Sequence, residues 1–273
     1  MKHFFYLFIV LCFLGAPTPG AAEVLLEGSL IQSGLLHGRV TPGTKVYLGK
    51  RQLRVTPQGD FICGFGRDAQ PQQTLTLINP DGSREKQQIT LAQRHYDIQR
   101  INGISKKMMH PSKTALKRIS QEAQLVAAAR KTDSNRFDFQ HAFIWPVIGR
   151  ISGVYGSQRV LNGEPRRPHF GIDIAAPKGT TVKAPAGGVV TLAHPGMFFS
   201  GKTLIIDHGY GLSSSFLHLS KILVKVGETV VQGQPIAEVG ATGRVTGPHL
   251  DWRINWFEQR LDPALFVPPM AGN

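Results

Sequence analysis

The chain has 273 residues, which is enough for one large domain or two small ones with hydrophobic cores. Its 31 basic and 18 acidic residues give a formal charge of +13, which favours an anionic partner such as a cell-wall polymer or a membrane surface. The sequence has no basic helix with interleaved aromatic residues, and this argues against nucleic acid as the partner.

The N-terminal segment has the pattern of a signal peptide. Lys2 begins a short basic start, residues 4–14 are almost entirely apolar, and small residues around Ala22 offer a cleavage site. The apolar run is too short for a stable membrane anchor, although an uncleaved membrane helix is the alternative interpretation. We therefore expect a signal peptide over residues 1–22 and export. Cleavage would leave Cys63 as the only cysteine, which excludes an internal disulfide and favours a buried thiol.

Residues 23–95 predict a small β-sandwich-like accessory domain. Short apolar strands are expected at 30–31, 45–48, 61–63 and 73–77, separated by turn-forming clusters such as Thr41-Pro42-Gly43. No catalytic constellation is visible there, so the expected role is spacing, docking or binding.

A helical connector and a linker are expected over residues 96–142. Pro111 and Ser112 supply a helix start, and apolar residues recur at helical spacing over 112–130. The opposite face is basic. A solvated face on a connector helix is the favoured interpretation, and a helix on a membrane surface is the alternative.

Residues 143–273 return to a β pattern rich in glycine. A strand–turn–strand unit is expected over 181–190, a second one with strands at 224–228 and 231–236, and a further strand over 202–207. The whole chain is therefore expected to be mainly β, with an antiparallel sheet or sandwich in its C-terminal domain.

Two short motifs in this domain carry the most chemical information. His169 and Asp173 belong to the first, and His249 and Asp251 to the second. Side chains alternate between the two faces of a β-strand, so the even spacing predicts that each pair shares one face. If the two strands lie side by side, two histidines and two carboxylates gather in one place, which outlines a metal site.

The order of these motifs resembles the lysostaphin-type zinc metallopeptidases, the M23 or LytM-like family, over residues 143 to about 266. Several separate motifs match in sequence, which is far more specific than a lone His-x-x-x-Asp. The matching stretches are His169-x-x-x-Asp173, Ala184-Pro185-x-x-Gly188, Asp207-His208-Gly209, Leu217-His218-Leu219 and Gly247-Pro248-His249-Leu250.

The resemblance implies the roles of five residues. His169 and Asp173 match the family's first motif and would be zinc ligands. His218 and His249 match the two catalytic histidines, and which of them acts as general base is left open. The family's third ligand is a histidine, and Asp251 stands at that position. The resemblance also implies the periplasm of a Gram-negative bacterium, with or without attachment to the envelope.

Asp251 changes the expected chemistry of the site. Aspartate is a competent zinc ligand, but it gives the set His169, Asp173 and Asp251 a formal charge of −2. That charge weakens the metal as a Lewis acid, and a carboxylate-rich set also suits Mn²⁺ or Fe²⁺. One Zn²⁺ per chain is the expected cofactor.

Two functions therefore compete. The first is a zinc-dependent endopeptidase that cuts peptide crosslinks of peptidoglycan, with stem peptides as substrate. The second is a catalytically degenerate domain that binds cell wall or activates another murein hydrolase, with a hydrolase or regulatory protein as partner. Arg166 and Arg167, just before the first motif, lie either on a cleft rim that contacts acidic stem peptides or on a solvated loop. A biotinyl or lipoyl carrier is disfavoured because no lysine sits at a suitable hairpin tip.

Overall fold

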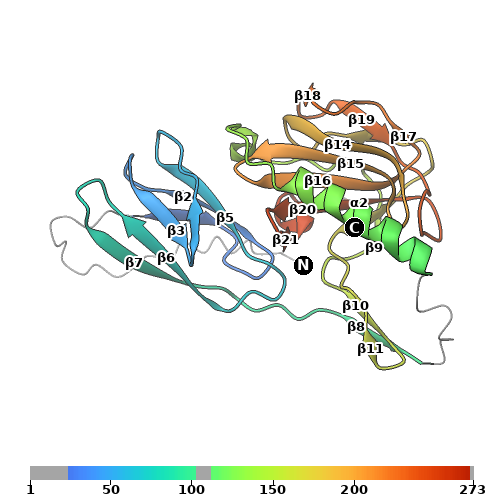
Figure 1. The fold of residues 1–273 in the computed structure, drawn as a ribbon, viewed down its shortest axis with the longest axis horizontal. Helices are drawn as coiled ribbons and strands as arrows, with labels where there is room; N and C mark the ends of the chain where they lie inside the picture. Colours follow the sequence, from blue (N-terminus) through green and yellow to red (C-terminus); the bar gives the residue numbers. More distant parts are fainter. Residues whose placement is uncertain (1–23, 103–111, 271–273) are drawn as a thin grey trace, which may run out of the picture.

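The computed structural model describes residues 24–102 and 112–270 and shows a mainly β protein with one α-helix among these residues (Figure 1). The predicted fold class is confirmed. The signal peptide expected over residues 1–22 lies outside the described residues. None of the helices in the described ranges is long and apolar enough to cross a membrane.

The N-terminal strands form two small antiparallel sheets (Figure 1). In the second sheet, buried and partly covered side chains alternate as expected for a strand with one face on the core. Leu75 and Leu77 are buried, while Thr74 and Thr76, which alternate with them, are only partly covered. The first sheet contains β1 (Leu25–Gly28), β2 (Leu35–Arg39) and β5 (Asp60–Gly64), and the second contains β3 (Lys45–Leu48), β4 (Arg51–Leu53), β6 (Gln72–Ile78) and β7 (Arg84–Thr90).

The segment after these sheets pairs with the C-terminal part of the chain. Strand β8 (Ile98–Ile101) runs parallel to β10 (Gln158–Leu161), which forms a hairpin with β11 (Glu164–Pro165). The hairpin directly precedes the first histidine motif, so the connector supports one of the segments that border the site.

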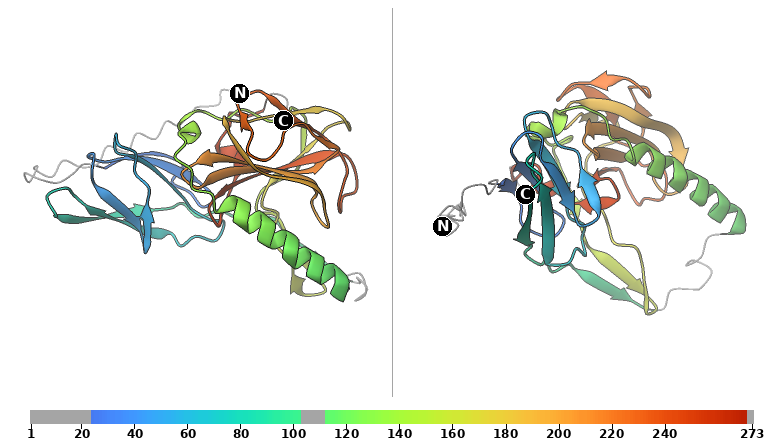
Figure 2. Two further views of the ribbon diagram at one scale, coloured as in Figure 1. Left: turned by 45° about the horizontal axis from the view of Figure 1, so that its top comes forward. Right: turned by 60° about the vertical axis from the view of Figure 1, so that its left-hand side comes forward.

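Helix α2 (Lys113–Arg130) occupies the position expected for the connector helix. It begins where the Ser112 side chain accepts a hydrogen bond from the Ala115 amide, which caps the first turn. Glu122 accepts a hydrogen bond from the Phe198 amide, and Arg118 donates to the Gly196 carbonyl. These bonds dock the helix beside the large C-terminal sheet (Figure 2).

An eight-stranded antiparallel sheet forms the centre of the C-terminal part, in the order β18-β14-β15-β16-β20-β12-β9 with β21 beside β20. A separate three-stranded sheet is ordered β13-β19-β17. The large sheet comprises β9 (Arg150–Gly153), β12 (Ile172–Ala175), β14 (Gly188–Met197), β15 (Gly201–Gly209), β16 (Leu212–Leu219), β18 (Thr229–Val230), β20 (His249–Trp256) and β21 (Gln259–Leu261). The small sheet comprises β13 (Thr181–Lys183), β17 (Lys221–Ile222) and β19 (Pro235–Glu238), and short 3-10 turns η1 (Asp138–Gln140) and η2 (Pro263–Leu265) complete the fold.

The strand expected over 224–228 is not formed. Gly227 has a φ of 85°, which is the left-handed region that a turn uses. The Lys225 amide also donates to the Glu228 carboxylate across this turn. The segment therefore turns before β18 rather than extending as a strand.

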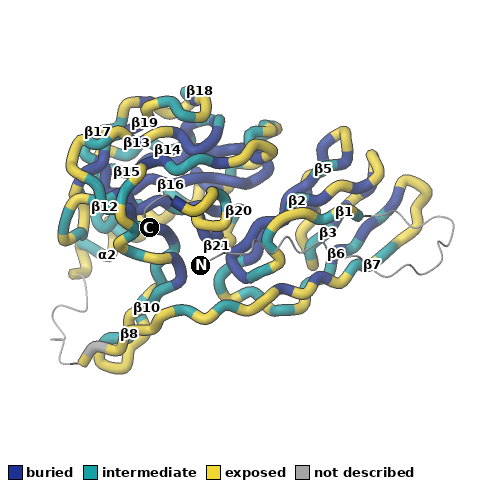
Figure 3. Tube along the Cα trace, turned by 180° about the vertical axis from the view of Figure 1, so that it is seen from behind, coloured by how far each residue is buried: buried dark blue, intermediate teal, exposed yellow. Residues whose placement is uncertain are grey.

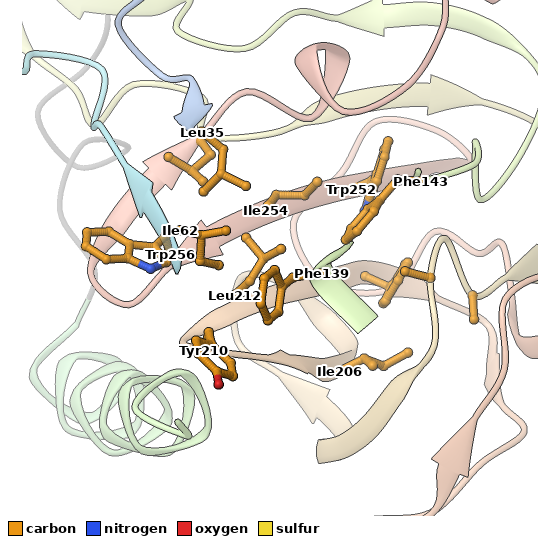
Figure 4. Close-up of a cluster of buried hydrophobic side chains, with 14 of the residues drawn as sticks. Leu35, Ile62, Phe139, Phe143, Ile206, Tyr210, Leu212, Trp252, Ile254 and Trp256 are labelled. Carbon is orange, nitrogen blue, oxygen red and sulfur yellow. The ribbon is translucent and has the colours of Figure 1, made fainter. Parts of the chain in front are cut away.

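One continuous core joins the N-terminal strands to the large sheet. Leu35 and Ile62 from β2 and β5 lie near Ile254 and Trp256 of β20 in the same buried cluster (Figure 4). Figure 3 shows the longest buried stretches along the central strands of the large sheet. Because Trp252 and Ile254 face this core, Asp251 and Arg253, which alternate with them along β20, face the opposite side.

Candidate metal centre

The structure brings the five predicted site residues together at one face of the large sheet. Strands β12 and β20 are antiparallel neighbours, and Asp173 lies directly opposite Asp251 in their ladder. The expectation that each motif forms one strand holds for the second only. His169 precedes β12, which begins at Ile172, and its backbone instead bonds to Gly156 and Ser157.

His169 and Asp173 nevertheless meet through their side chains. Nε2 of His169 lies 3.2 Å from Oδ1 of Asp173, and both side chains are only partly exposed. Neither atom has a hydrogen-bond partner of good geometry among the described residues. Burial opposes the charged form of His169, but Asp173 and Asp251 outweigh it and raise the pKa of the ring. Two adjacent buried ligand atoms that no protein group satisfies fit a shared metal ion.

His218 sits at the end of β16 in a strained backbone conformation. Its φ is 64°, which is uncommon for a residue other than glycine and is often retained at functional sites. Nδ1 lies 2.9 Å from the Thr242 carbonyl, which can only accept, so this nitrogen carries the proton. Burial lowers the pKa of the ring. His218 is therefore held neutral, with Nε2 unprotonated and 4.0 Å from Oδ2 of Asp251.

His249 is oriented in the same way. Its Nδ1 lies 2.9 Å from the Gly247 carbonyl, so Nε2 again carries the lone pair in the neutral ring. That Nε2 is 3.8 Å from Oδ1 of Asp173. The ring centroids of His218 and His249 are 4.9 Å apart, so the two imidazoles border the same space.

Asp251 has a partner that the sequence motifs did not indicate. Nε of Arg253 lies 2.9 Å and 3.1 Å from its two carboxylate oxygens, and Nη2 lies 2.5 Å from Oδ2. Burial raises the pKa of Asp251, but the charge and hydrogen bonds of Arg253 outweigh burial and hold the pKa well below its usual range. The pair is a fork-like ion pair between residues two apart on one face of β20.

Two glycines make room for the carboxylates. A Cβ atom at Gly153, which lies opposite Asp173 in the ladder, would sit 2.3 Å from Oδ2 of Asp173. A Cβ atom at Gly171 would sit 2.4 Å from Oδ1 of Asp251. The register of β12 against β9 also shifts just after Asp173. Such irregularities re-aim side chains beside functional sites.

The donor set fits one divalent metal ion. A nitrogen of His169 and one oxygen each of Asp173 and Asp251 lie within 4.8 Å of one another. The first two donors lack other partners. An ionised carboxylate has about four lone-pair sites, so Arg253 can hold Asp251 and still leave sites for an ion. His, Asp and Asp are ligands that Zn²⁺ accepts.

The remaining histidine of the motifs has a structural place. His208 is fully buried on β15, with Nδ1 2.6 Å from the Gly187 carbonyl and Nε2 2.8 Å from the Ser214 hydroxyl. Burial lowers its pKa to about 4. Trp252 and Trp256, which follow the second motif on β20, are buried in the core. Sequence reasoning missed Arg253, Gly153 and Gly171, although strand alternation alone puts Arg253 on the face of Asp251.

Comparisons with known proteins match the part of the chain that carries this site. The profile of peptidase family M23 matches residues 167–263, a range that contains all five site residues. Peptidoglycan DD-endopeptidase ShyA of Vibrio cholerae is 42% identical over 128 residues, or 45% of this chain and 29% of that protein. Peptidoglycan DD-endopeptidase ShyB of the same organism is 45% identical over 106 residues, or 38% of this chain and 24% of that protein.

The matches thus span less than a third of the length of these curated relatives. A crystal structure assigned to peptidase M23 from Pseudomonas aeruginosa covers far more, with a TM-score of 0.69 and 29% identity over 87% of this chain and 95% of that one. The motifs, the site geometry and the profile match lead to one conclusion. Residues 167–263 of this chain form a domain of peptidase family M23.

Proposed function

We propose that the protein is a zinc-dependent endopeptidase that hydrolyses peptide crosslinks of peptidoglycan. The observation that carries the proposal is the convergence of His169, Asp173 and Asp251 within 4.8 Å beside two histidines that backbone carbonyls orient. The relatives ShyA and ShyB, which are named peptidoglycan DD-endopeptidases, support the same substrate class.

The residues around the donors suit hydrolysis of an amide. A zinc ion held by His169, Asp173 and Asp251 would supply an acidified water and polarise a peptide carbonyl. His218 and His249 each present Nε2 toward the carboxylates, so the neutral form of either ring can accept a proton there and return it to a leaving amine. The ring that holds a proton on Nε2 can donate a hydrogen bond to a developing oxyanion.

Arg253 compensates the extra negative charge that Asp251 brings to the donor set. Relative to a His, Asp and His set, the extra carboxylate adds one negative charge. The guanidinium of Arg253, bonded to both oxygens of Asp251, adds one positive charge at the same place. The pair Asp251–Arg253 therefore has the formal charge of a neutral ligand, which would offset the loss of Lewis acidity that the extra carboxylate causes in a bound metal.

A second function is favoured by the same contact. If Arg253 takes the place of the ion, the domain is catalytically degenerate and binds cell wall or activates another murein hydrolase. The specific observation is that both oxygens of Asp251 already accept from a cation inside the site.

Zinc content and cleavage together separate the two functions. The full chain is assayed for bound zinc and for cleavage of purified crosslinked muropeptides, alongside Asp251→His and His218→Ala. We expect one zinc per chain in all three, cleavage by the wild type and a large loss in His218→Ala. A wild type without zinc or cleavage, together with an Asp251→His variant that gains both, would establish the degenerate function instead.

We also propose a layout and a location. Residues 1–22 would direct export to a Gram-negative periplasm, 23–95 would serve as an accessory domain, 96–142 as a connector and 143–273 as the peptidase domain. The apolar run at residues 4–14 supports export. Cell fractionation with N-terminal sequencing tests this, and an intact N-terminus in the cytosol would refute it.

A further inference from the structure

An arginine cluster lies beside the site, on the face of the large sheet that bears Asp251. The register defines its place. Ser215 of β16 lies opposite Arg253 of β20, and Asn255 is the next residue of β20 on that face. Arg130 bonds to Ser215 and Arg260 bonds to Asn255. We use the name arginine cluster for Arg130, Arg253 and Arg260.

Arg130 reaches the cluster from the last turn of α2 and is deeply buried. Only 9% of the residue is exposed. Its Nη2 donates to the Ser215 hydroxyl at 2.9 Å, while its Nε is buried without a hydrogen-bond partner. The part of the chain that the structure describes offers Arg130 no carboxylate at ion-pair distance, and a buried guanidinium with an unused donor is costly unless a partner satisfies it.

Arg260 closes the cluster from β21. Its Nη1 donates to Asn255 Oδ1 at 3.2 Å, and its guanidinium carbon lies 5.6 Å from the ring centroid of Phe170 in the first motif. No carboxylate is paired with it among the described residues at ion-pair distance. Its side chain is partly exposed, so a ligand can approach from this side.

The charges here do not balance. Burial lowers the pKa of Arg130, and the positive charges of Arg260, Arg253 and Arg167 lower it further. Burial likewise lowers the pKa of Arg260 to about 10, with Arg253 and Arg167 again acting in the same direction. The negative charge of Asp251 raises the pKa of Arg130, but this carboxylate is already paired with Arg253. The local excess of positive charge can be neutralised by an anion.

We propose that the arginine cluster binds a carboxylate of the peptide substrate next to the metal centre. This inference rests on the proposed function for its choice of ligand. Guanidinium groups match carboxylates with paired N–H donors, and partial burial strengthens that bond. A carboxylate anchored at Arg130 and Arg260 would fix the peptide relative to His169 and Asp251, which selects stem peptides with an acidic group at one position.

Binding of two matched peptides tests the site. The probes are a synthetic crosslinked stem-peptide dimer with free carboxylates and the same dimer with those carboxylates amidated. Titration calorimetry uses the full chain carrying His218→Ala, so that cleavage does not interfere. We expect the free acid to bind about tenfold to a hundredfold more tightly, which is the usual worth of a charge-assisted hydrogen bond. Arg130→Gln and Arg260→Gln should each remove most of that preference.

Lys117→Gln is the matched control, since Lys117 is an exposed cation on the same helix and lies outside the cluster. It should keep the preference. Arg130→Lys retains the charge and guards against misfolding of Arg130→Gln, and circular dichroism checks each variant. Equal affinity of the His218→Ala protein, with its arginine cluster intact, for both peptides would overturn the inference. A preserved preference in a wild type that cuts neither peptide would instead overturn only the proposed function.

Discussion

Arg253 binds both carboxylate oxygens of Asp251 through Nε and Nη2, and the two residues lie on one face of strand β20. Asp251 is almost fully buried, whereas the Arg253 side chain keeps some contact with solvent. The pair thus acts as a unit in which each charge makes burial of the other tolerable.

Breaking the pair from one side should destabilise the fold. Asp251→Asn leaves the guanidinium of Arg253 largely buried without its counter-charge, and we expect a loss of about 2–3 kcal/mol, below the value for a fully buried pair because Arg253 is partly solvated. Urea unfolding followed by tryptophan fluorescence measures it in metal-free protein. The double variant Asp251→Asn/Arg253→Gln should recover part of the loss, and strictly additive effects would show that the residues do not act as a unit.

Removal of a donor should abolish tight zinc binding. His169→Ala and Asp173→Ala each remove one of three ligands, and we expect the zinc dissociation constant to rise by at least about a hundredfold. Competition with a chromophoric chelator gives this constant. His95→Ala, at an exposed histidine outside the donor set, is the control and should leave the constant unchanged. Unaltered zinc affinity in both ligand variants would place the ion elsewhere.

His218 should affect turnover and not metal content. Loss of a general acid–base group lowers rates by about 10²–10⁴-fold, so His218→Ala should reduce kcat on crosslinked muropeptides by this order while zinc stoichiometry stays at the wild-type value. The comparison with His249→Ala then shows which ring contributes more. Loss of zinc in His218→Ala would instead assign this residue to the metal.

His208 should make stability fall in acid. Its pKa is about 4 in the folded state and about 6.5 in an unfolded chain, so the unfolded state binds more protons between these values. Stability is then fully present above about pH 6.5 and is lost as the pH falls toward 4, by about 3 kcal/mol in total. Urea titrations at several pH values should show a flatter dependence in His208→Gln. The exposed-site variant His95→Gln should follow the wild type, and an unchanged slope in His208→Gln would disprove the assignment.

Gly171 should tolerate no side chain. An added Cβ would meet Oδ1 of Asp251 at 2.4 Å and Cγ of Arg253 at 2.7 Å, so Gly171→Ala must displace the ion pair. We expect a loss of about 1–3 kcal/mol together with weaker zinc binding. Gly196→Ala is the matched control, because nothing lies within 4 Å of its added Cβ. A wild-type zinc constant in Gly171→Ala would mean that the pair can shift without affecting the donors.

Much of the site followed from local pattern. The pair His249 and Asp251 shares a face because strand alternation depends only on the backbone. The helix at 113–130 followed from apolar spacing and a serine cap. The strand expected at 224–228 was wrong because a turn around Gly227 overrode the β-branched composition. His169 lies outside β12 because its backbone bonds to Gly156 and Ser157 instead of a sheet neighbour.

The sequence by itself determined the family resemblance, the donor residue types and their pairing along the chain, because ligand chemistry and strand periodicity are local properties. Only the tertiary structure decided which atoms meet. The ladder between β12 and β20 sets Asp173 against Asp251, and the fold turns Arg253 onto that carboxylate. Docking of α2 brings Arg130 to Ser215, 85 residues away in the chain. Contacts at such separation depend on how whole elements pack, and no local pattern encodes them.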